Sequence, residues 1–495
     1  MDKLPLDKKA CYRAFMSHDP RFDGRLFVGV SSTGIYCRPV CRTKTPKEEN
    51  CTFFTSAAAA QAAGYRPCLK CRPELAPGLA PIDGPANLAR RAALMLEDDL
   101  LPEGGVEELA AALGVTGRHL RRVFAAEYGV PPVKYRETHR LLLAKSLLTD
   151  TDLPVTEVAY AAGFGSLRRF NAIFLRQCRM PPSALRKETR AQGGAGRDGV
   201  ALYLGYRPPY RWEDILDFLA GRAIPGVESV SDGVYARTVA LQSEKGLCRG
   251  WISVSHAEKK YALAVTASAS LLPVLPKVLA GVRHLFDLRC DPAVIFERLS
   301  AMNDIRPGLF APGTRVPGCF DAFEMAVRAI LGQQVTVAAA RTLAGRVAAS
   351  LGAELETPIA GLTHTFPSPA DICRLGDSPE SVLGPLGVTG VRARAIAALA
   401  KGLTSGELDW SLGAAPEEQM KKLLKLPGFG PWTVQYVAMR ALGWPDAMLE
   451  TDYGVKKALS GLNPKEILTL AEDWRPWRSY ATMGLWNSLK NGGQT

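Results

Sequence analysis

Four cysteines in two close pairs are the residues of this sequence best placed to do chemistry. Cys37 and Cys41 enclose Arg-Pro-Val, and Cys68 and Cys71 enclose Leu-Lys. Each pair can chelate a metal from one turn, and the insert folds the second pair over the ion, as in tetrahedral zinc sites. Zinc keeps a thiol deprotonated, and the thiolate is a nucleophile. On spacing alone we favour a structural zinc knuckle, with a reactive centre as the alternative.

Basic residues crowd this cysteine quartet. A zinc ion with four thiolates carries about two net negative charges, and a purely structural zinc site needs no ring of cations. The ring therefore favours the reactive alternative. Its members are Arg38, Arg42, Lys44, Arg66, Lys70 and Arg72.

The residues around the quartet resemble a known family. Thr33-Gly-Ile-Tyr-Cys-Arg-Pro-Val-Cys-Arg and Gly64-Tyr-Arg-Pro-Cys-Leu-Lys-Cys-Arg-Pro are similar to the N-terminal domain of the Ada DNA-methylation sensors. The resemblance implies that Cys37 accepts a methyl group from a phosphotriester of the DNA backbone. It also implies zinc ligation by Cys41, Cys68 and Cys71 and phosphate contacts from Thr33, Lys44 and Arg66.

Length and composition bound the class of protein. The 495 residues suffice for three or four domains, and a hydrophobic content of 47% is typical of globular proteins. A net charge of +12 favours a polyanionic partner, and the first 75 residues carry 13 Lys and Arg against 7 Asp and Glu. Without a signal-peptide pattern or an unbroken apolar span, we expect a cytoplasmic protein with no membrane partner, on the bacterial nucleoid when DNA-bound. Seven further cysteines without a pairing pattern suit a reducing compartment.

Two similar helical segments lie between Gly- and Pro-rich linkers at residues 73–85 and 191–199. Residues 106–124 and 155–174 each have apolar positions at helical spacing, a glycine turn and an arginine-rich second helix, which indicates two helix-turn-helix units. Residues 87–187 resemble the AraC-type DNA-binding domain, including Gly129-Val-Pro-Pro-Val-Lys-Tyr-Arg. Any single arginine there is more often a solvated helix face, and contacts to bases and to phosphates remain open alternatives. The recognition helices, starting near Thr116 and Ser166, would present Arg118, His119, Arg121, Arg122, Arg168, Arg169, Asn171 and Arg176 toward DNA.

From residue 200 the pattern changes. Alternating apolar residues predict antiparallel strands at 202–206, 233–241, 248–255 and 260–265, with helices at 212–219 and 275–286. Beyond residue 291 the pattern is helical.

A glycine-containing turn lies between helices predicted at 420–425 and 434–442, with the sequence Leu426-Pro-Gly-Phe-Gly-Pro-Trp-Thr. Its backbone N–H groups can bind a DNA phosphate, although Gly-x-Gly also serves as an ordinary turn. Asp452 follows; alone it would be read as a helix cap or a solvated charge.

Residues 202–487 resemble 3-methyladenine DNA glycosylase II, the AlkA family. Matching segments include Pro208-Pro-Tyr-Arg-Trp and Asp321-Ala-Phe-Glu-Met-Ala-Val-Arg-Ala-Ile-Leu-Gly-Gln-Gln-Val. The resemblance implies that Asp452 stabilises an oxocarbenium-like sugar and helps water attack. It places Trp432, Tyr436 and Trp486 around a flipped, positively charged base, with core packing as the alternative for the tryptophans. The implied DNA contacts are Gln333, Gln334, Gly428, Gly430 and Thr433.

Two positions refine this expectation. Glycosylases that also cut the backbone carry a lysine at the seventh hairpin position, which is Trp432 here, so we expect a monofunctional hydrolase without a cofactor. Gln334 stands where the family commonly has a leucine wedge, and a glutamine can still fill the gap left by the flipped base. The Pro-Cys-His-Arg nucleophile of the second half of Ada proteins is absent from the sequence.

The sequence thus predicts a multidomain α+β protein. We expect a zinc-binding methyl-acceptor domain at residues 1–78, an all-α tandem helix-turn-helix domain at 84–190, an antiparallel α+β domain, TBP-like by resemblance, at 200–290, and an all-α helix-hairpin-helix glycosylase domain at 291–495.

The predicted function is a DNA-3-methyladenine glycosylase II fused to a zinc-dependent transcriptional regulator that senses methylphosphotriesters by suicidal transfer to Cys37. One alternative is a regulator whose glycosylase half only scans DNA. Another is a glycosylase tethered to DNA by a structural zinc module. The expected cofactor is one Zn²⁺, and the expected partners are double-stranded DNA and, for an activator, RNA polymerase.

Overall fold

The computed structural model describes residues 7–18, 22–23, 26–54, 57–73, 84–98, 105–190, 199–243, 246–410 and 416–491. The chain forms two compact units, residues 1–93 with 113–132 and residues 94–112 with 133–495. The predicted linkers fall largely on residues 74–83 and 191–198, outside the described residues. In the part of the chain that the structure describes, no helix is both long and apolar enough to cross a membrane.

A small sheet organises the cysteine-bearing unit, and the sequence did not predict it. The strands run in the order β3-β1-β2-β4, and β2 pairs with β4 in parallel, with Ile35 opposite Arg66. Because β2 ends at Cys37 and β4 ends one residue before Cys68, this register brings the two cysteine pairs together. The elements of this region are α1 (Lys8–Met16), β1 (Phe27–Val30), β2 (Ile35–Cys37), η2 (Glu48–Asn50), β3 (Cys51–Phe54), α2 (Ala57–Ala62) and β4 (Arg66–Pro67).

The two arginine-rich helices begin where the sequence predicts, next to Thr116 and Ser166. The Thr116 hydroxyl accepts a hydrogen bond from the His119 N–H at the start of α5, and Ser166 caps α8 in the same way through Arg169. Left-handed residues, Gly129 and Arg179, end the two helices. The helices of this region are α3 (Gly84–Glu97), α4 (Val106–Ala112), α5 (Gly117–Tyr128), α6 (Pro132–Asp150), α7 (Val155–Ala161), α8 (Leu167–Cys178) and α9 (Pro182–Arg190).

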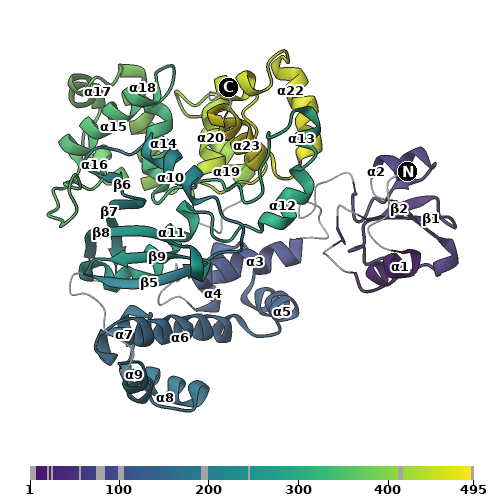
Figure 1. The fold of residues 1–495 in the computed structure, drawn as a ribbon, viewed down its shortest axis with the longest axis horizontal. Coiled ribbons are helices and arrows are strands. Elements are labelled where there is room, and N and C mark those ends of the chain that lie inside the picture. The colour runs from purple at the N-terminus through teal and green to yellow at the C-terminus, as the bar shows by residue number, and fades with distance from the viewer. Residues whose placement is uncertain are drawn as a thin grey trace. The chain divides into compact units, whose positions relative to one another are not determined.

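A five-stranded antiparallel sheet opens the C-terminal half, in the order β5-β9-β8-β7-β6. The four predicted strands are confirmed, and β6 was not predicted because Glu228–Ser231 is short and alternates little. Helix α10 packs beside β6 (Figure 1). The elements are β5 (Val200–Gly205), α10 (Trp212–Ala220), β6 (Glu228–Ser231), β7 (Val234–Ser243), β8 (Gly246–Ala257), η4 (Glu258–Lys260), β9 (Ala262–Ala267), η5 (Ala269–Val274) and α11 (Leu275–Leu285).

Helices follow from residue 292, around α14, whose side chains are almost all buried. Helix α14 contacts α15, α18 and α20, and α21 packs on α23. The elements are α12 (Pro292–Leu299), α13 (Met302–Ile305), α14 (Ala322–Leu331), α15 (Val337–Leu351), α16 (Pro369–Cys373), α17 (Pro379–Leu383), η6 (Gly384–Leu386), α18 (Gly390–Thr404), α19 (Pro416–Leu423), α20 (Pro431–Arg440), α21 (Tyr453–Ala458), α22 (Pro464–Ala471), η7 (Glu472–Trp474) and α23 (Arg478–Asn491).

A buried ion network joins the sheet to α14. Arg237 of β7 donates to Glu324 at 2.6 Å, and Arg328 donates to Glu228 at 2.8 Å. Glu228 also accepts from the Tyr235 hydroxyl at 2.6 Å. Since the charges are paired and hydrogen-bonded, removing one partner would leave the remaining charge buried without a partner.

We therefore expect Glu324→Ala to destabilise the C-terminal half by about 3 kcal/mol or more, because Arg237 loses its nearest carboxylate. All 8 tryptophans lie at or beyond residue 212, so denaturant unfolding followed by tryptophan fluorescence reports on this half alone. The control Glu356→Ala removes an exposed glutamate and should change stability by less than about 0.5 kcal/mol. Equal stability of the two variants would contradict the role of the network.

Candidate metal centre and candidate active site

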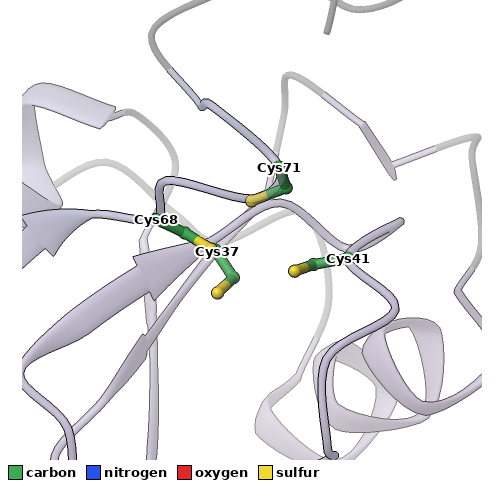
Figure 2. Close-up of side chains that lie close together, drawn as sticks. All are labelled: Cys37, Cys41, Cys68 and Cys71. Carbon is green, nitrogen blue, oxygen red and sulfur yellow. The ribbon is translucent and has the colours of Figure 1, made fainter. Parts of the chain in front are cut away.

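The four cysteines converge as the sequence predicts. Their sulfur atoms all lie within 4.8 Å of one another, and all four residues are buried (Figure 2). Zn–S bonds of about 2.3 Å in a tetrahedron separate sulfurs by about 3.8 Å, so the quartet fits a zinc ion with little adjustment. Hydrogen bonds to Cys41 and Cys71, together with burial, raise the pKa of the Cys37 thiol far above its usual value when no cation is present. The same hydrogen bonds, donated by Cys37 and Cys71, lower the pKa of Cys41. A bound metal ion would therefore matter most for holding Cys37 as a thiolate.

The sulfur atoms differ in their hydrogen-bond donors. Cys71 accepts from the Arg38 backbone N–H at 3.4 Å, and Cys41 lies 3.3 Å from the Thr43 hydroxyl. Among the described residues, no donor outside the quartet reaches the sulfur of Cys37 or Cys68. A hydrogen bond draws charge from a thiolate. As thiolates, Cys37 and Cys68 would therefore be more nucleophilic than Cys41 and Cys71.

The predicted basic ring must be corrected at Arg38, which is buried. Its side chain is 1% exposed and forms a bidentate ion pair with Asp23, with Nε 2.7 Å from Oδ1. It also donates to the Cys71 carbonyl at 3.2 Å. Arg38 is therefore an internal brace between the two cysteine pairs and does not face a ligand. The other five ring members, Arg42, Lys44, Arg66, Lys70 and Arg72, are exposed, as is Thr33.

The arginines predicted to face DNA lie on the exposed sides of α5 and α8. Arg118, Arg121 and Arg122 are exposed on α5, with His119 half-buried, while Leu120 and Phe124 point into the core. On α8, Arg176 forms an ion pair with Glu137 at 3.0 Å, which ties this side chain to α6. The exposed residues on α8 also include Arg168, Arg169 and Asn171.

The predicted hairpin links α19 to α20. Gly428 has φ of +80°, and a Cβ there would lie 2.8 Å from Ala395, so the turn requires glycine. The Gln333 side-chain amide donates to the Gly428 carbonyl at 2.8 Å and to the Thr433 hydroxyl at 3.0 Å. Gln333 thus secures the hairpin to the segment that carries Gln334, which is exposed with φ of +55°.

Asp452 is held by four N–H groups from three places. Its Oδ1 accepts from the backbone N–H of Gly454 at 2.8 Å and of Val455 at 3.1 Å, which caps α21. The Trp486 indole also donates to Oδ1, at 2.9 Å, and the Trp432 indole donates to Oδ2 at 3.2 Å. A carboxylate anion, which only accepts, suits this set of donors. The cap interpretation and the active-site interpretation therefore apply to the same side chain.

The three predicted aromatic residues lie together. Trp432 stacks on Tyr436 with ring centroids 5.1 Å apart, and Tyr436 lies 6.4 Å from Trp486. Phe218 of α10 stacks against Trp486 at 6.1 Å. Sequence reasoning missed Phe218, because one apolar residue in an amphipathic helix carries no signal beyond core packing. Burial alone would raise the pKa of Tyr436, but the charges of Arg440 and Arg222 bring it below its usual value.

The segment leading to Asp452 is pinned to α23. Arg478 donates to the buried carboxylate of Asp446 at 2.7 Å, and Arg475 pairs with it as well. The Ser479 hydroxyl donates to the Trp444 carbonyl at 2.7 Å and accepts from the Ala447 N–H at 3.1 Å. Since α23 also carries Trp486, one helix positions both the loop and one of its indole donors.

Three family models match the chain. They are the metal binding domain of Ada over residues 10–74, a helix-turn-helix domain over 109–188 and the AlkA N-terminal domain over 201–321. With the folds and sites above, they define a DNA glycosylase fused to a zinc-containing, helix-turn-helix regulator.

Relatives span both the whole chain and its parts. The probable bifunctional transcriptional activator/DNA repair enzyme AlkA of Mycobacterium tuberculosis is 38% identical over 98% of this chain and 97% of that protein. The chain belongs to this family of bifunctional transcriptional activator/DNA repair enzymes. DNA-3-methyladenine glycosylase 2 of Escherichia coli is 39% identical over 57% of this chain and 95% of its own length. The enzyme AdaA of Bacillus subtilis is 25% identical over 37% of this chain and 83% of its own.

The Asp23–Arg38 pair yields a test at the metal centre. We expect Asp23→Ala to speed zinc release to a chelator, because Arg38 would be left buried without its carboxylate beside the Cys71 carbonyl. Zinc loss measured with a chromogenic chelator would report the change. The control Glu49→Ala, an exposed glutamate in the same unit, should release zinc at the wild-type rate. Identical rates for both variants would show that the brace does not hold the centre.

Proposed function

We propose that the C-terminal half excises alkylated bases, including 3-methyladenine, from DNA by hydrolysis. This proposal rests on the Asp452 carboxylate, which is held between two indoles and lies next to a hairpin that can bind a DNA phosphate. Aromatic faces attract the positive charge of an N3- or N7-alkylated purine. Asp452 stabilises positive charge on the sugar as the base leaves, and it orients the water that attacks C1′. Gln334 is the side chain proposed to fill the space of the flipped base.

We also propose that Cys37 accepts a methyl group from a DNA phosphotriester. A zinc ion held by Cys37, Cys41, Cys68 and Cys71 would supply the charge that keeps the Cys37 sulfur a thiolate at neutral pH. The sulfur attacks the methyl carbon, the carbon–oxygen bond breaks, and its electrons stay on the phosphate, leaving a diester and a thioether. Exposed Thr33, Lys44 and Arg66 are the proposed phosphate contacts. Among the residues that the structure describes, no donor outside the quartet reaches the Cys37 sulfur, which supports Cys37 over Cys41 and Cys71 as the acceptor.

The remaining roles complete the proposal. Arginines of α5 and α8 bind promoter DNA, and RNA polymerase is the proposed partner of the activator. The five-stranded sheet region is the proposed TBP-like domain, and the helices beyond it are the proposed all-α glycosylase domain. The rival, a regulator that only scans DNA with its C-terminal half, accounts for the two backbone donors that make Asp452 a helix cap but not for the two indole donors.

Methyl transfer has a direct test. Protein incubated with DNA carrying methyl phosphotriesters should gain one methyl group on Cys37, located by mass spectrometry of its peptides. Cys37→Ala should abolish the transfer, because the nucleophile is gone. The matched control Cys51→Ser changes a buried cysteine outside the quartet and should react normally. An adduct on Cys68 would move the acceptor role to the other sulfur without an outside donor.

Base excision tests Asp452. We expect Asp452→Asn to lose release of 3-methyladenine from alkylated DNA by a factor of about 100 or more. Asparagine still caps a helix, so folding and DNA affinity should persist. The exposed control Asp473→Asn should release the base at the wild-type rate. Because Trp432 occupies the lysine position, borohydride should trap no covalent DNA complex. Near-normal turnover of Asp452→Asn, or a trapped complex, would refute the mechanism.

A further inference from the structure

Arg440 is a buried cation next to the proposed active site. It is 2% exposed and lies one helical turn after Tyr436 on α20. Its Nη1 donates to the Tyr436 hydroxyl at 2.9 Å, its Nη2 donates to the Gly318 carbonyl at 2.9 Å, and its Nε donates to the Pro317 carbonyl. No carboxylate among the described residues forms an ion pair with it. Backbone and hydroxyl oxygens therefore fix the guanidinium in all three directions.

The backbone that holds Arg440 has little freedom. A Cβ on Gly318 would lie 2.4 Å from the His284 carbonyl oxygen, so residue 318 packs directly on the end of α11. A guanidinium bound to this backbone is a fixed point in the core, because its planar fork cannot rotate without breaking several hydrogen bonds.

Two aromatic pairs extend from this fixed point toward Asp452. The guanidinium carbon lies 4.8 Å from the Phe218 ring centroid and 5.7 Å from that of Tyr436. Phe218 stacks on Trp486, and Tyr436 stacks on Trp432. Both tryptophans then donate to the Asp452 carboxylate. Arg440 thus contacts both aromatic residues, Phe218 and Tyr436, that stack on the two indole donors.

We propose that Arg440 is a positioning residue for base excision, which orients the Asp452 carboxylate through the Tyr436–Trp432 and Phe218–Trp486 pairs. This inference rests on the proposed catalytic role of Asp452. Arg440 touches neither carboxylate oxygen, so its effect is on geometry. Misplacement of a reacting group by about 1 Å can lower a rate by about a hundredfold. A lysine cannot reproduce the fork, because an ammonium group is a point charge on a flexible stem.

A matched arginine separates positioning from stability. Arg315 is also 2% exposed, and it donates to the backbone carbonyls of Asp287, Cys290, Arg207 and Pro209. Its guanidinium lies 4.9 Å from the Tyr210 ring, and in the described part of the chain no aromatic pair links it to Asp452. Arg315→Lys should therefore cost stability much as Arg440→Lys does, without moving the carboxylate.

The experiment compares single-turnover release of 3-methyladenine, DNA affinity and unfolding midpoint for the full-length variants. Arg440→Lys should slow release at least about tenfold with DNA affinity unchanged within about twofold, whereas Arg315→Lys should keep its release rate within about twofold. Guanidinium ions at non-denaturing concentration should restore part of the rate of Arg440→Ala, but none of that of Asp452→Asn.

Other outcomes overturn the inference. A normal release rate for Arg440→Lys, or equal losses for both lysine variants without guanidinium rescue, would mean that Arg440 is only structural. If Asp452→Asn itself remained active, the proposed function would fail first. An inactive Asp452→Asn with a fully active Arg440→Lys would reject the positioning role alone.

Discussion

A carboxylate surrounded by aromatic rings can stabilise positive charge only if its oxygens are hydrogen-bonded without being neutralised by a cation. This constraint accounts for much of the helix packing in the C-terminal half. Asp452 meets it with two backbone N–H groups and two indoles. No lysine or arginine pairs with Asp452 among the described residues, so its negative charge stays available to a developing cation. The donors come from α20, α21 and α23, and the packing of these three helices therefore determines where the charge lies.

The buried charges elsewhere serve the same geometry. The Asp446–Arg478 pair holds the loop before Asp452 against α23, and the Arg237–Glu324 network holds α14 against the sheet. Gly454 shows how little space remains, since a Cβ there would lie 2.8 Å from the Trp486 ring and 3.1 Å from the Asp452 Oδ1 atom. In the N-terminal unit, the four cysteines belong to a small apolar core that also contains Phe15, Leu26 and Val28, and a zinc ion bound by their sulfur atoms would cross-link that core.

Local chemistry was predictable from the sequence, and so were two distant groupings implied by family resemblance, the cysteine quartet and the aromatic residues around Asp452. Other distant contacts were not predictable. The cysteine spacing, the caps of α5 and α8 and the glycine hairpin depend on residues within a few positions of one another. The Asp23–Arg38 brace, the β2–β4 pairing and the contact of Phe218 with Trp486 join residues that are far apart in the chain, and each residue alone looks ordinary. Arg38 illustrates the difference: its position beside Cys37 suggested an exposed cation, whereas its partner 15 residues earlier makes it part of the interior.

The two proposed reactive groups have different lifetimes. If Cys37 accepts a methyl group as proposed, the thioether has no route back to a thiolate within the site, so each molecule would record a single phosphotriester. The Asp452 carboxylate, in its proposed role, would leave every cycle unchanged and act on one lesion after another. Under this proposal, one polypeptide would combine a group that reacts once with a catalyst that turns over, and each newly made chain would supply both in a fixed one-to-one proportion.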